Sequence, residues 1–308
     1  MGICLDPSNQ LFCEAVRNDI YVDKSLLIQQ IEYLRHKVNK YICVIRPEGF
    51  GKSTDANMLV AFYSCGCDSH DLFDSLEISK TAIYEEQLNK HHVICMHMQS
   101  FLSDIHSVDE MIELVTDRIM AELKMKYRIA FFDENDLSFS LEDIYAETGS
   151  RFVFIIDEWD CVYRDCKWDR EDWKKCSDYL TRLLKDKSYV EFVYMTGILP
   201  IKKYGTHGSL NMFNEMTMIH SGSLSAYMGF TSDEVKELCD RYGVDYSLMK
   251  EWYGGYRMNA DCFVFSSGAV VCALMDRKYE NYWISTETYE TLHVYIDMNF
   301  DGLKDSIV

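Results

Sequence analysis

The chain has 308 residues, 48% of them hydrophobic, and carries a formal net charge of −19 at pH 7. This size allows a large core and predicts two domains, whereas the acidic balance argues against bulk nucleic-acid binding, which usually needs a basic patch. Because no apolar run reaches the length of a membrane span and the N-terminus lacks a signal-like region, we expect no membrane contact.

Apolar runs and helical periods alternate over most of the chain. The expected strands are Tyr41–Ile45, His92–Met98, Phe152–Ile156, Tyr189–Met195 and the short Glu215–Ile219. The expected helices between them are Ser53–Tyr63, Val108–Lys124, Leu141–Thr148 and Arg170–Lys185. This α/β alternation predicts a parallel sheet flanked by helices.

Beyond Ser221 the pattern becomes mostly helical. Thr231 has the character of a helix N-cap, and acidic residues follow it in the first turn. We therefore expect two domains. Residues 1–221 form the core with an N-terminal helical and extended segment, and residues 222–308 form a helical lid domain.

The strand Tyr41–Ile45 leads into a loop that contains Gly-Lys-Ser and is followed by a helical pattern. The loop residues are Arg46, Pro47, Glu48, Gly49, Phe50, Gly51, Lys52, Ser53 and Thr54. In a phosphate-binding P-loop, backbone N–H groups and a helix N-terminus point at the phosphates. Lys52 would contact the β and γ oxygens, and the Ser53 hydroxyl would ligate Mg²⁺. Because Arg46 replaces the first glycine of the usual pattern, an ordinary βα turn with a surface lysine is the alternative.

A second motif follows the expected strand at 152–156. Five apolar residues run directly into Asp157 and Glu158. Buried parallel strands end in this way at the carboxyl edge of a sheet, where ligands of open α/β sheets bind. Asp157 would hold Mg²⁺, and Glu158 would polarise the attacking water. A core strand followed by a solvated acidic turn is the alternative, but the order and spacing of the two motifs favour a P-loop NTPase core.

The sequence also resembles the bacterial AAA-ATPase-like proteins over nearly its whole length. The resemblance rests on Tyr21-Val22-Asp23-Lys24-Ser25, Arg46-Pro47, Phe50-Gly51-Lys52-Ser53, Phe154-Ile155-Ile156-Asp157-Glu158-Trp159-Asp160, Thr196-Gly197-Ile198-Leu199-Pro200-Ile201, Gly229-Phe230-Thr231, Glu251-Trp252-Tyr253 and Gly255-Tyr256. Members of this family often carry a C-terminal nuclease domain of the PD-(D/E)XK type. We expect no such part in this chain and assign it no cleavage chemistry.

The resemblance implies a P-loop ATPase with ATP and Mg²⁺ as ligands. It gives Lys52 and Ser53 the phosphate and Mg²⁺ roles, and Asp157 and Glu158 the acidic roles. It places Thr196 at a sensor position, on the strand between those that carry the two motifs, where its hydroxyl would hold the attacking water or the γ-phosphate. A strand-end threonine before a tight glycine turn is the alternative.

Two segments depart from the family pattern. The family typically reads Arg-Pro-Arg-Arg-Phe-Gly-Lys-Ser, whereas this chain has Glu48 and Gly49 in place of two arginines. A carboxylate beside a polyphosphate is expected to repel it. The family lid often contains Tyr-Asn-Pro, and Phe265-Ser266-Ser267 stands there instead. Both departures bear on how strongly the chain binds or hydrolyses a nucleotide.

The twelve cysteines include no C-x-x-C pair, and several lie in apolar runs. Free thiols at this density are typical of a reducing compartment, so we expect a cytoplasmic protein. Cys65 and Cys67 are too close in sequence for a zinc knuckle, and we expect no metal cluster. His91-His92 and His207 have no partner at metal-ligand spacing and are interpreted as solvated or core histidines.

Further residues near the motifs are open candidates. Arg164, Arg170 and Arg182 follow the second motif, and any of them would serve as an arginine finger supplied in trans. Lys202-Lys203 would reach a phosphate or form a solvated pair. The aromatic cluster from Trp252 to Tyr256 is expected to be a packed turn of the lid rather than a base-stacking surface.

These observations leave three functions open. The first is an ATPase whose hydrolysis moves the lid as a switch or motor for another domain, a protein partner or a second copy of the chain. The second is a nucleotide-binding regulatory scaffold with little or no hydrolysis. The Asp157-Glu158 pair favours the first, and Glu48 favours the second. The third, a small-molecule kinase, shares the P-loop but has no acceptor motif.

Overall fold

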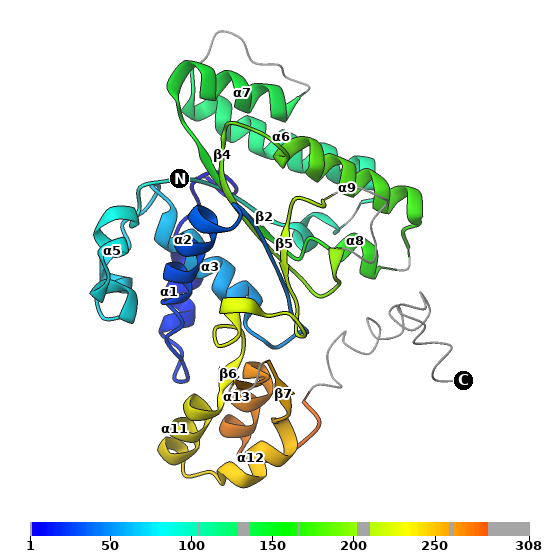
Figure 1. The fold of residues 1–308 in the computed structure, drawn as a ribbon. Coiled ribbons are helices and arrows are strands. Elements are labelled where there is room, and N and C mark those ends of the chain that lie inside the picture. The colour runs from blue at the N-terminus through cyan, green and yellow to red at the C-terminus, as the bar shows by residue number, and fades with distance from the viewer. Residues whose placement is uncertain are drawn as a thin grey trace.

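The computed structural model describes residues 2–103, 105–128, 136–165, 167–201, 210–258 and 262–282. At its centre lies a sheet of five parallel strands in the order β2-β3-β4-β1-β5 (Figure 1). The strands are β1 (Tyr41–Ile45), β2 (His92–His97), β3 (Phe152–Asp157), β4 (Val190–Gly197) and β5 (Asn214–Met216). The predicted parallel α/β sheet is confirmed, and each expected strand is found within a few residues of its predicted bounds.

Helices cover both faces of this sheet, because alternate residues of each strand point to opposite sides. Ile42 and Val44 of β1 pack on one side, and Cys43 and Ile45 pack on the other. On the first face lie α1 (Gln10–Val16), α2 (Leu27–Lys37), α3 (Lys52–Tyr63), α4 (His70–Phe73), the 3₁₀ turn η1 (Glu77–Lys80) and α5 (Ala82–Gln87). On the second face lie the 3₁₀ turn η2 (Met98–Phe101), α6 (Val108–Lys126), α7 (Leu137–Thr148), α8 (Cys161–Arg164) and α9 (Arg170–Leu184).

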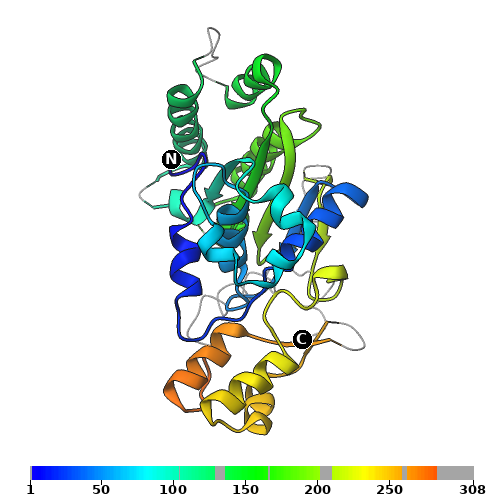
Figure 2. The same ribbon diagram turned by 90° about the vertical axis from the view of Figure 1, so that its left-hand side faces the viewer.

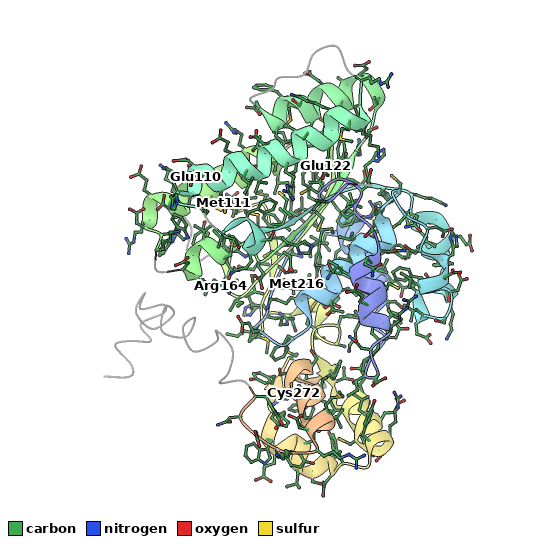
Figure 3. All side chains as sticks on the ribbon, turned by 180° about the vertical axis from the view of Figure 1, so that it is seen from behind. Glu110, Met111, Glu122, Arg164, Met216 and Cys272 are labelled. Carbon is green, nitrogen blue, oxygen red and sulfur yellow. The ribbon has the colours of Figure 1, made fainter. Side chains whose placement is uncertain are left out.

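The N-terminal residues lie along the outer edge of β2. Leu5 forms an antiparallel bridge with Ile94, and the Cys95 N–H donates to the Cys4 carbonyl at 2.8 Å. The Glu122 carboxylate of α6 accepts the N–H groups of the segment at 2.6–3.0 Å, and Figure 3 shows where Glu122 lies on that helix. This edge of the sheet is therefore covered rather than left open for pairing.

The C-terminal elements form a smaller layer of their own (Figure 2). They comprise β6 (Phe230–Thr231), α11 (Ser232–Tyr242), α12 (Tyr246–Tyr253), β7 (Tyr256–Arg257), β8 (Phe263–Phe265) and α13 (Ser267–Asp276). The preceding 3₁₀ turn, η3 (Gly222–Leu224), packs against α2 on the first face of the main sheet. Thr231 caps α11 in a reciprocal capping box with Glu234, as its sequence indicated. This part is mostly helical as predicted, and it also contains a small antiparallel sheet in the order β6-β8-β7 that the sequence did not predict.

The boundary between 221 and 222 stays a prediction. Residues 283–308 of the expected lid lie outside the described residues. Among the described helices, none combines the length and the apolar character that a bilayer crossing needs.

Candidate functional site

The loop between β1 and α3 has the backbone geometry of an anion site. Gly49 and Gly51 both adopt the left-handed conformation, with φ of +75° and +82°, which favours glycine because it has no Cβ. Gly51 is the N-cap of α3, and no side chain accepts a hydrogen bond at that helix end. The first N–H groups of a 12-residue helix are therefore left for another acceptor.

Lys52 is not a surface lysine. It is only 6% exposed, and its Nζ donates to the Pro47 carbonyl at 3.0 Å within the loop. Burial lowers the pKa of Lys52, while the nearby carboxylates of Asp160, Asp157 and Glu158 act in the opposite direction. The surface lysine of the alternative interpretation is therefore not found, and the phosphate-binding role of this segment stays a prediction.

The two predicted Mg²⁺ ligands lie near each other. Asp157 ends β3, is 4% exposed and accepts a hydrogen bond from the Thr196 hydroxyl, and the Ser53 hydroxyl is close enough to lower the pKa of its carboxyl. Burial alone would raise the pKa of Asp157, but hydrogen bonds from His97, Thr196 and Ser53 hold it below its usual range. The carboxylate is therefore an anion beside the start of α3.

His97 is a member of this site that the sequence did not single out. Its Nδ1 lies 3.5 Å from the Asp157 carboxylate. Hydrogen bonds with Asp157 and Cys95 raise the pKa of His97 to about 10. The register of the two strands would have predicted this neighbour, because His97 ends β2 directly opposite Asp157 at the end of β3.

Glu158 follows in an unusual backbone conformation for a residue with a side chain. Its φ is +57°, and its N–H donates to the Thr196 hydroxyl oxygen at 3.2 Å. Burial raises the pKa of Glu158, and the Arg164 guanidinium acts against that shift. Backbone strain of this kind is often stored at functional sites.

Thr196 lies on the strand that the family resemblance implied, because β4 lies between β1 and β3. Its hydroxyl donates to the Asp157 carboxylate and accepts from the Glu158 N–H. In this structure the hydroxyl therefore links the two acids of the second motif. The next residue, Gly197, packs so closely on Trp159 that an added Cβ would lie 2.4 Å from the indole nitrogen.

Arg164 of α8 joins the two motifs through ion pairs, and Figure 3 shows its place on the helix. Its side chain is 7% exposed and lies 3.3 Å from Glu158, 3.6 Å from Asp160 and 3.8 Å from Glu48. The unusual Glu48 therefore has a cation beside it. Because Arg164 is committed to acids of its own chain, this placement does not favour its use as a finger in trans.

Two residues of the loop turn their side chains away from the helix N-terminus. Arg46 is fully buried, donates to the carbonyls of Ile45 and Met216 at 2.7 and 2.9 Å, and has its pKa lowered to about 10 by burial. Phe50 is 1% exposed and meets Tyr256 edge-on at 5.1 Å. Arg46 thus supports the ends of β1 and β5, and Phe50 anchors the loop on the C-terminal elements.

The start of α13 also contacts the loop. The Gly49 carbonyl accepts hydrogen bonds from the Gly268 N–H and the Ser267 hydroxyl, both at 2.8 Å. The Phe50 carbonyl accepts from the Gly229 N–H at 3.0 Å. The C-terminal elements are therefore attached to the loop by hydrogen bonds.

A cavity of about 330 Å³ opens beside the loop. Three parts of the chain line it: residues between Ala15 and Lys24, residues between Gly49 and Asp55, and C-terminal residues on either side of Phe230 and Ser267. Asp55 is buried there with its Oδ2 lacking a hydrogen-bond partner, and burial raises its pKa well above the usual range. The Tyr21 hydroxyl is a second buried polar group of the lining, so the cavity combines apolar side chains with a few polar groups, as is common in ligand sites.

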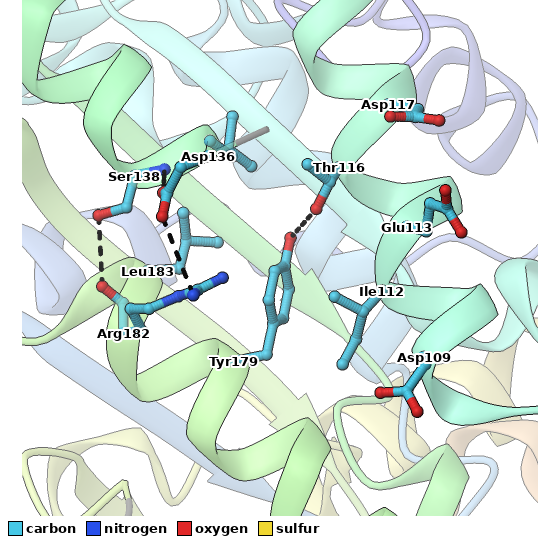
Figure 4. Close-up of a pocket in the computed structure, with 11 residues that line it drawn as sticks. Asp109, Ile112, Glu113, Thr116, Asp117, Asp136, Ser138, Tyr179, Arg182 and Leu183 are labelled. Carbon is cyan, nitrogen blue, oxygen red and sulfur yellow. Dashed lines mark hydrogen bonds and ion pairs between the residues drawn. The ribbon is translucent and has the colours of Figure 1, made fainter. Parts of the chain in front are cut away.

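The other candidates lie elsewhere. Arg182 lines a separate cavity of about 240 Å³ between α6, α7 and α9, where it lies 3.9 Å from Asp136 (Figure 4). The end of α9 leads into the start of β4, so this cavity is at the amino end of the strands, opposite the P-loop. Lys202, Lys203 and His207 lie outside the described residues.

The family of the chain follows from a comparison with family models. A family model described as Predicted AAA-ATPase matches residues 12–206, more than half of the chain. Among solved structures, a Walker-type ATPase of Pyrococcus abyssi is similar, with 13% identity, coverage of 94% of this chain and 76% of that chain, and a TM-score of 0.42. None of the curated proteins matches the sequence. Because the matched residues include both motifs and the strands β1 to β4, the chain belongs to the AAA-ATPase-like family.

Proposed function

We propose that this chain binds ATP with Mg²⁺ and hydrolyses it as a switch or motor. The observation that carries the proposal is the convergence of buried Lys52 and buried Asp157 at the glycine-bounded start of α3. A buried cation and a buried anion at one helix N-terminus suit a polyphosphate and its metal ion. Family membership supports a nucleotide-binding, ATPase-like role.

The residues present fit Mg²⁺. Ser53 offers a hydroxyl oxygen and Asp157 an anionic carboxylate, and both are hard oxygen donors that lie near each other. When bound, the ion neutralises charge on the phosphates. Lys52 would leave the Pro47 carbonyl to contact the phosphate oxygens.

In this proposal Glu158 activates the attacking water. Its carboxylate would accept a proton from the attacking water. Thr196 acts as a positioning residue, because its hydroxyl fixes the carboxylate of Asp157 and the backbone of Glu158. Arg164 holds Glu158 until nucleotide enters.

The nucleoside would occupy the 330 Å³ cavity beside Gly51 and Thr54. Its walls come from the N-terminal segment, the loop and the C-terminal elements, so a bound base would contact all three. We therefore propose that residues 222–308 act as the lid of the 1–221 core, and that lid movement is passed to a protein partner or a second copy of the chain in the cytoplasm.

One observation favours the regulatory scaffold instead. The proposed base Glu158 is paired with Arg164, and Glu48 lies in the phosphate loop. A site that keeps its base paired would bind nucleotide and turn it over slowly. Binding and turnover measured on one preparation separate the two functions.

The test of both begins with nucleotide binding. Mg-ATP is expected to raise the melting temperature, because a ligand that binds only the folded state stabilises it by about 2.7 kcal/mol at a hundred times its Kd. Lys52→Ala should abolish this rise, while the exposed Lys80→Ala should keep it. Equal shifts in the three proteins would overturn the P-loop assignment, and binding without phosphate release in the wild type would favour the scaffold.

A further inference from the structure

Three side chains with metal-ligating atoms meet at the amino end of β2. Asp6 comes from the N-terminal segment, Cys65 from the turn after α3, and His92 opens β2. One ligand atom of each lies within 4.8 Å of the other two. His97 and Asp157 lie at the other end of the strand, about 17 Å away at the usual rise per residue. The cluster is therefore separate from the proposed Mg²⁺ site.

The distances within the cluster are close to those of a tetrahedral site. His92 Nδ1 lies 3.1 Å from Cys65 Sγ and 3.2 Å from Asp6 Oδ2. Ligand atoms bonded at about 2.0–2.3 Å to one tetrahedral ion lie about 3.3–3.8 Å from each other. Small rotations of the side chains would therefore bring all three donors onto one ion.

The backbone holds the carboxylate in place. Asp6 adopts φ of +47°, and its Oδ1 accepts the Val93 N–H at 2.8 Å, which leaves Oδ2 turned to the cluster. Next to Cys65, Gly66 packs on the Asp6 carbonyl so closely that an added Cβ would lie 2.4 Å from it. A hydrogen bond such as that from the Val93 N–H to Asp6 Oδ1 orients a ligating carboxylate toward a metal.

A cation already lies among the three donors. The Lys126 ammonium donates to the Asp6 carboxylate and lies 2.9 Å from His92 Nδ1 and 4.0 Å from Cys65 Sγ. Lys126 is the last residue of α6, and its side chain is 34% exposed. It can therefore turn into solvent without unfolding the helix.

We propose that Asp6, Cys65 and His92 form a binding site for a divalent transition-metal ion, preferably Zn²⁺, which displaces the Lys126 ammonium. A thiolate, an imidazole and one carboxylate select Zn²⁺ over Mg²⁺, which prefers oxygen ligands alone. On binding, the Cys65 thiol releases its proton to solvent, and His92 binds through its neutral Nδ1. The fourth position is left to water.

The site would fasten the start of the chain to the sheet. Asp6, Cys65 and His92 belong to three segments that are far apart in the sequence, and one ion would cross-link them. Because the ion would bind the folded state, it would stabilise the protein, and the melting temperature would rise with the logarithm of the ion concentration above its Kd. We expect nucleotide binding to be unaffected, since the P-loop follows the carboxyl end of β1 and the cluster lies at the amino end of β2.

Co²⁺ is the probe, because a thiolate ligand gives it an intense charge-transfer absorption that oxygen ligands do not. The full chain is titrated with CoCl₂ in excess Mg²⁺ and a non-thiol reductant, and then with ZnCl₂ to displace Co²⁺. We expect the charge-transfer band in the wild type and its loss in Cys65→Ser. Cys67→Ser removes a neighbouring thiol outside the cluster and should keep the band.

Lys126→Met supplies the second test. Removing the resident cation should tighten Co²⁺ binding about tenfold or more, because a like charge a few ångströms from the ion opposes binding. A matched change, Lys80→Met on the surface, should have no effect. Equal bands in Cys65→Ser and Cys67→Ser would overturn the proposal. So would a band in Lys126→Met alone, because the ammonium would then hold the site in the natural protein.

Discussion

The Arg164 guanidinium lies 3.8 Å from the Glu48 carboxylate, so the acid that departs from the family pattern has a cation next to it. Both side chains are largely buried, at 7% and 19% exposure. An ion pair in this setting is stronger than an exposed one. The repulsion that Glu48 alone would exert on a polyphosphate is thereby reduced.

Replacement of Arg164 by Met should weaken Mg-ATP binding by about tenfold, because Arg164 would no longer offset the negative charge of Glu48 near the phosphates. Glu48→Gln in the same protein should restore most of the loss. The measurement is a titration of wild type, both single variants and the double variant by calorimetry. If the double variant binds as weakly as Arg164→Met, the effect comes from lost packing around Asp160 and not from the charge of Glu48.

Glu48→Gln alone should tighten Mg-ATP binding by about threefold at low salt, since a nearby negative charge is removed. The gain should shrink as ionic strength rises. Glu77→Gln, an exposed acid far from the loop, is the control. A salt-independent gain would show that Glu48 acts through loop conformation.

Glu158→Gln should keep nucleotide binding and lower turnover by at least about tenfold, because a general base typically contributes about 10²–10⁴ in rate. Phosphate release and ATP binding are measured on the same samples, with the exposed Glu171→Gln as the control. Unchanged turnover in Glu158→Gln would exclude this residue as the base.

Stability should depend on an ion pair on the first face of the sheet. Glu191 of β4 lies 2.6 Å from Arg35 of α2. Burial would raise the pKa of Glu191, but Arg35 outweighs it and holds that pKa below the ordinary 4.5. A lowered carboxyl pKa stabilises the folded state above pH 4.5 and loses that contribution as the pH falls further.

Glu191→Gln should therefore lower the free energy of unfolding by about 2 kcal/mol at pH 7, between the values for buried and exposed pairs. The difference from wild type should narrow below pH 4.5. Urea unfolding at several pH values measures both the loss of stability at pH 7 and its change with pH. Glu142→Gln removes a more exposed ion pair with Lys187 and should lower the free energy of unfolding by less at every pH. A Glu191 effect that persists unchanged in acid would point to packing.

Gly49→Ala tests the contact between the loop and α13. Both Gly49 and Gly149 have positive φ, but an added Cβ at Gly49 would lie 2.8 Å from the Ser266 hydroxyl, whereas one at Gly149 meets nothing within 4 Å. Gly149→Ala should cost about 1 kcal/mol from backbone strain alone. Gly49→Ala should lower the free energy of unfolding by more than this. The additional loss should disappear when Ser266→Gly is introduced in the same protein. Equal costs in thermal unfolding would mean that the contact adds nothing.

The sequence alone predicted the parallel sheet and the positions of the two motifs along the chain. Apolar runs marked the strands, and a strand followed by Gly51-Lys52-Ser53 or by Asp157-Glu158 has few structural interpretations. The expected position of Thr196 followed from the family resemblance, and the strand order agrees with it.

Partners across the fold were harder to predict. Arg164 and Glu48 are far apart in the sequence, and only the packing of α8 against the loop brings them together. Asp6, Cys65 and His92 likewise meet through the alignment of the N-terminal segment on β2, which no local pattern specifies. The direction of the Arg46 side chain depended on β5, a strand of three residues with little hydrophobic signal.

The Gly49 carbonyl that accepts from the Ser267 hydroxyl joins the two segments that differ from the pattern implied by the family resemblance. The loop and the start of α13 are thus in direct contact. An added Cβ at Gly49 would lie 2.8 Å from the Ser266 hydroxyl, so a side chain at position 49 requires room at the start of α13. Grafting a relative's loop onto this chain would therefore succeed only if the beginning of α13 is transplanted with it.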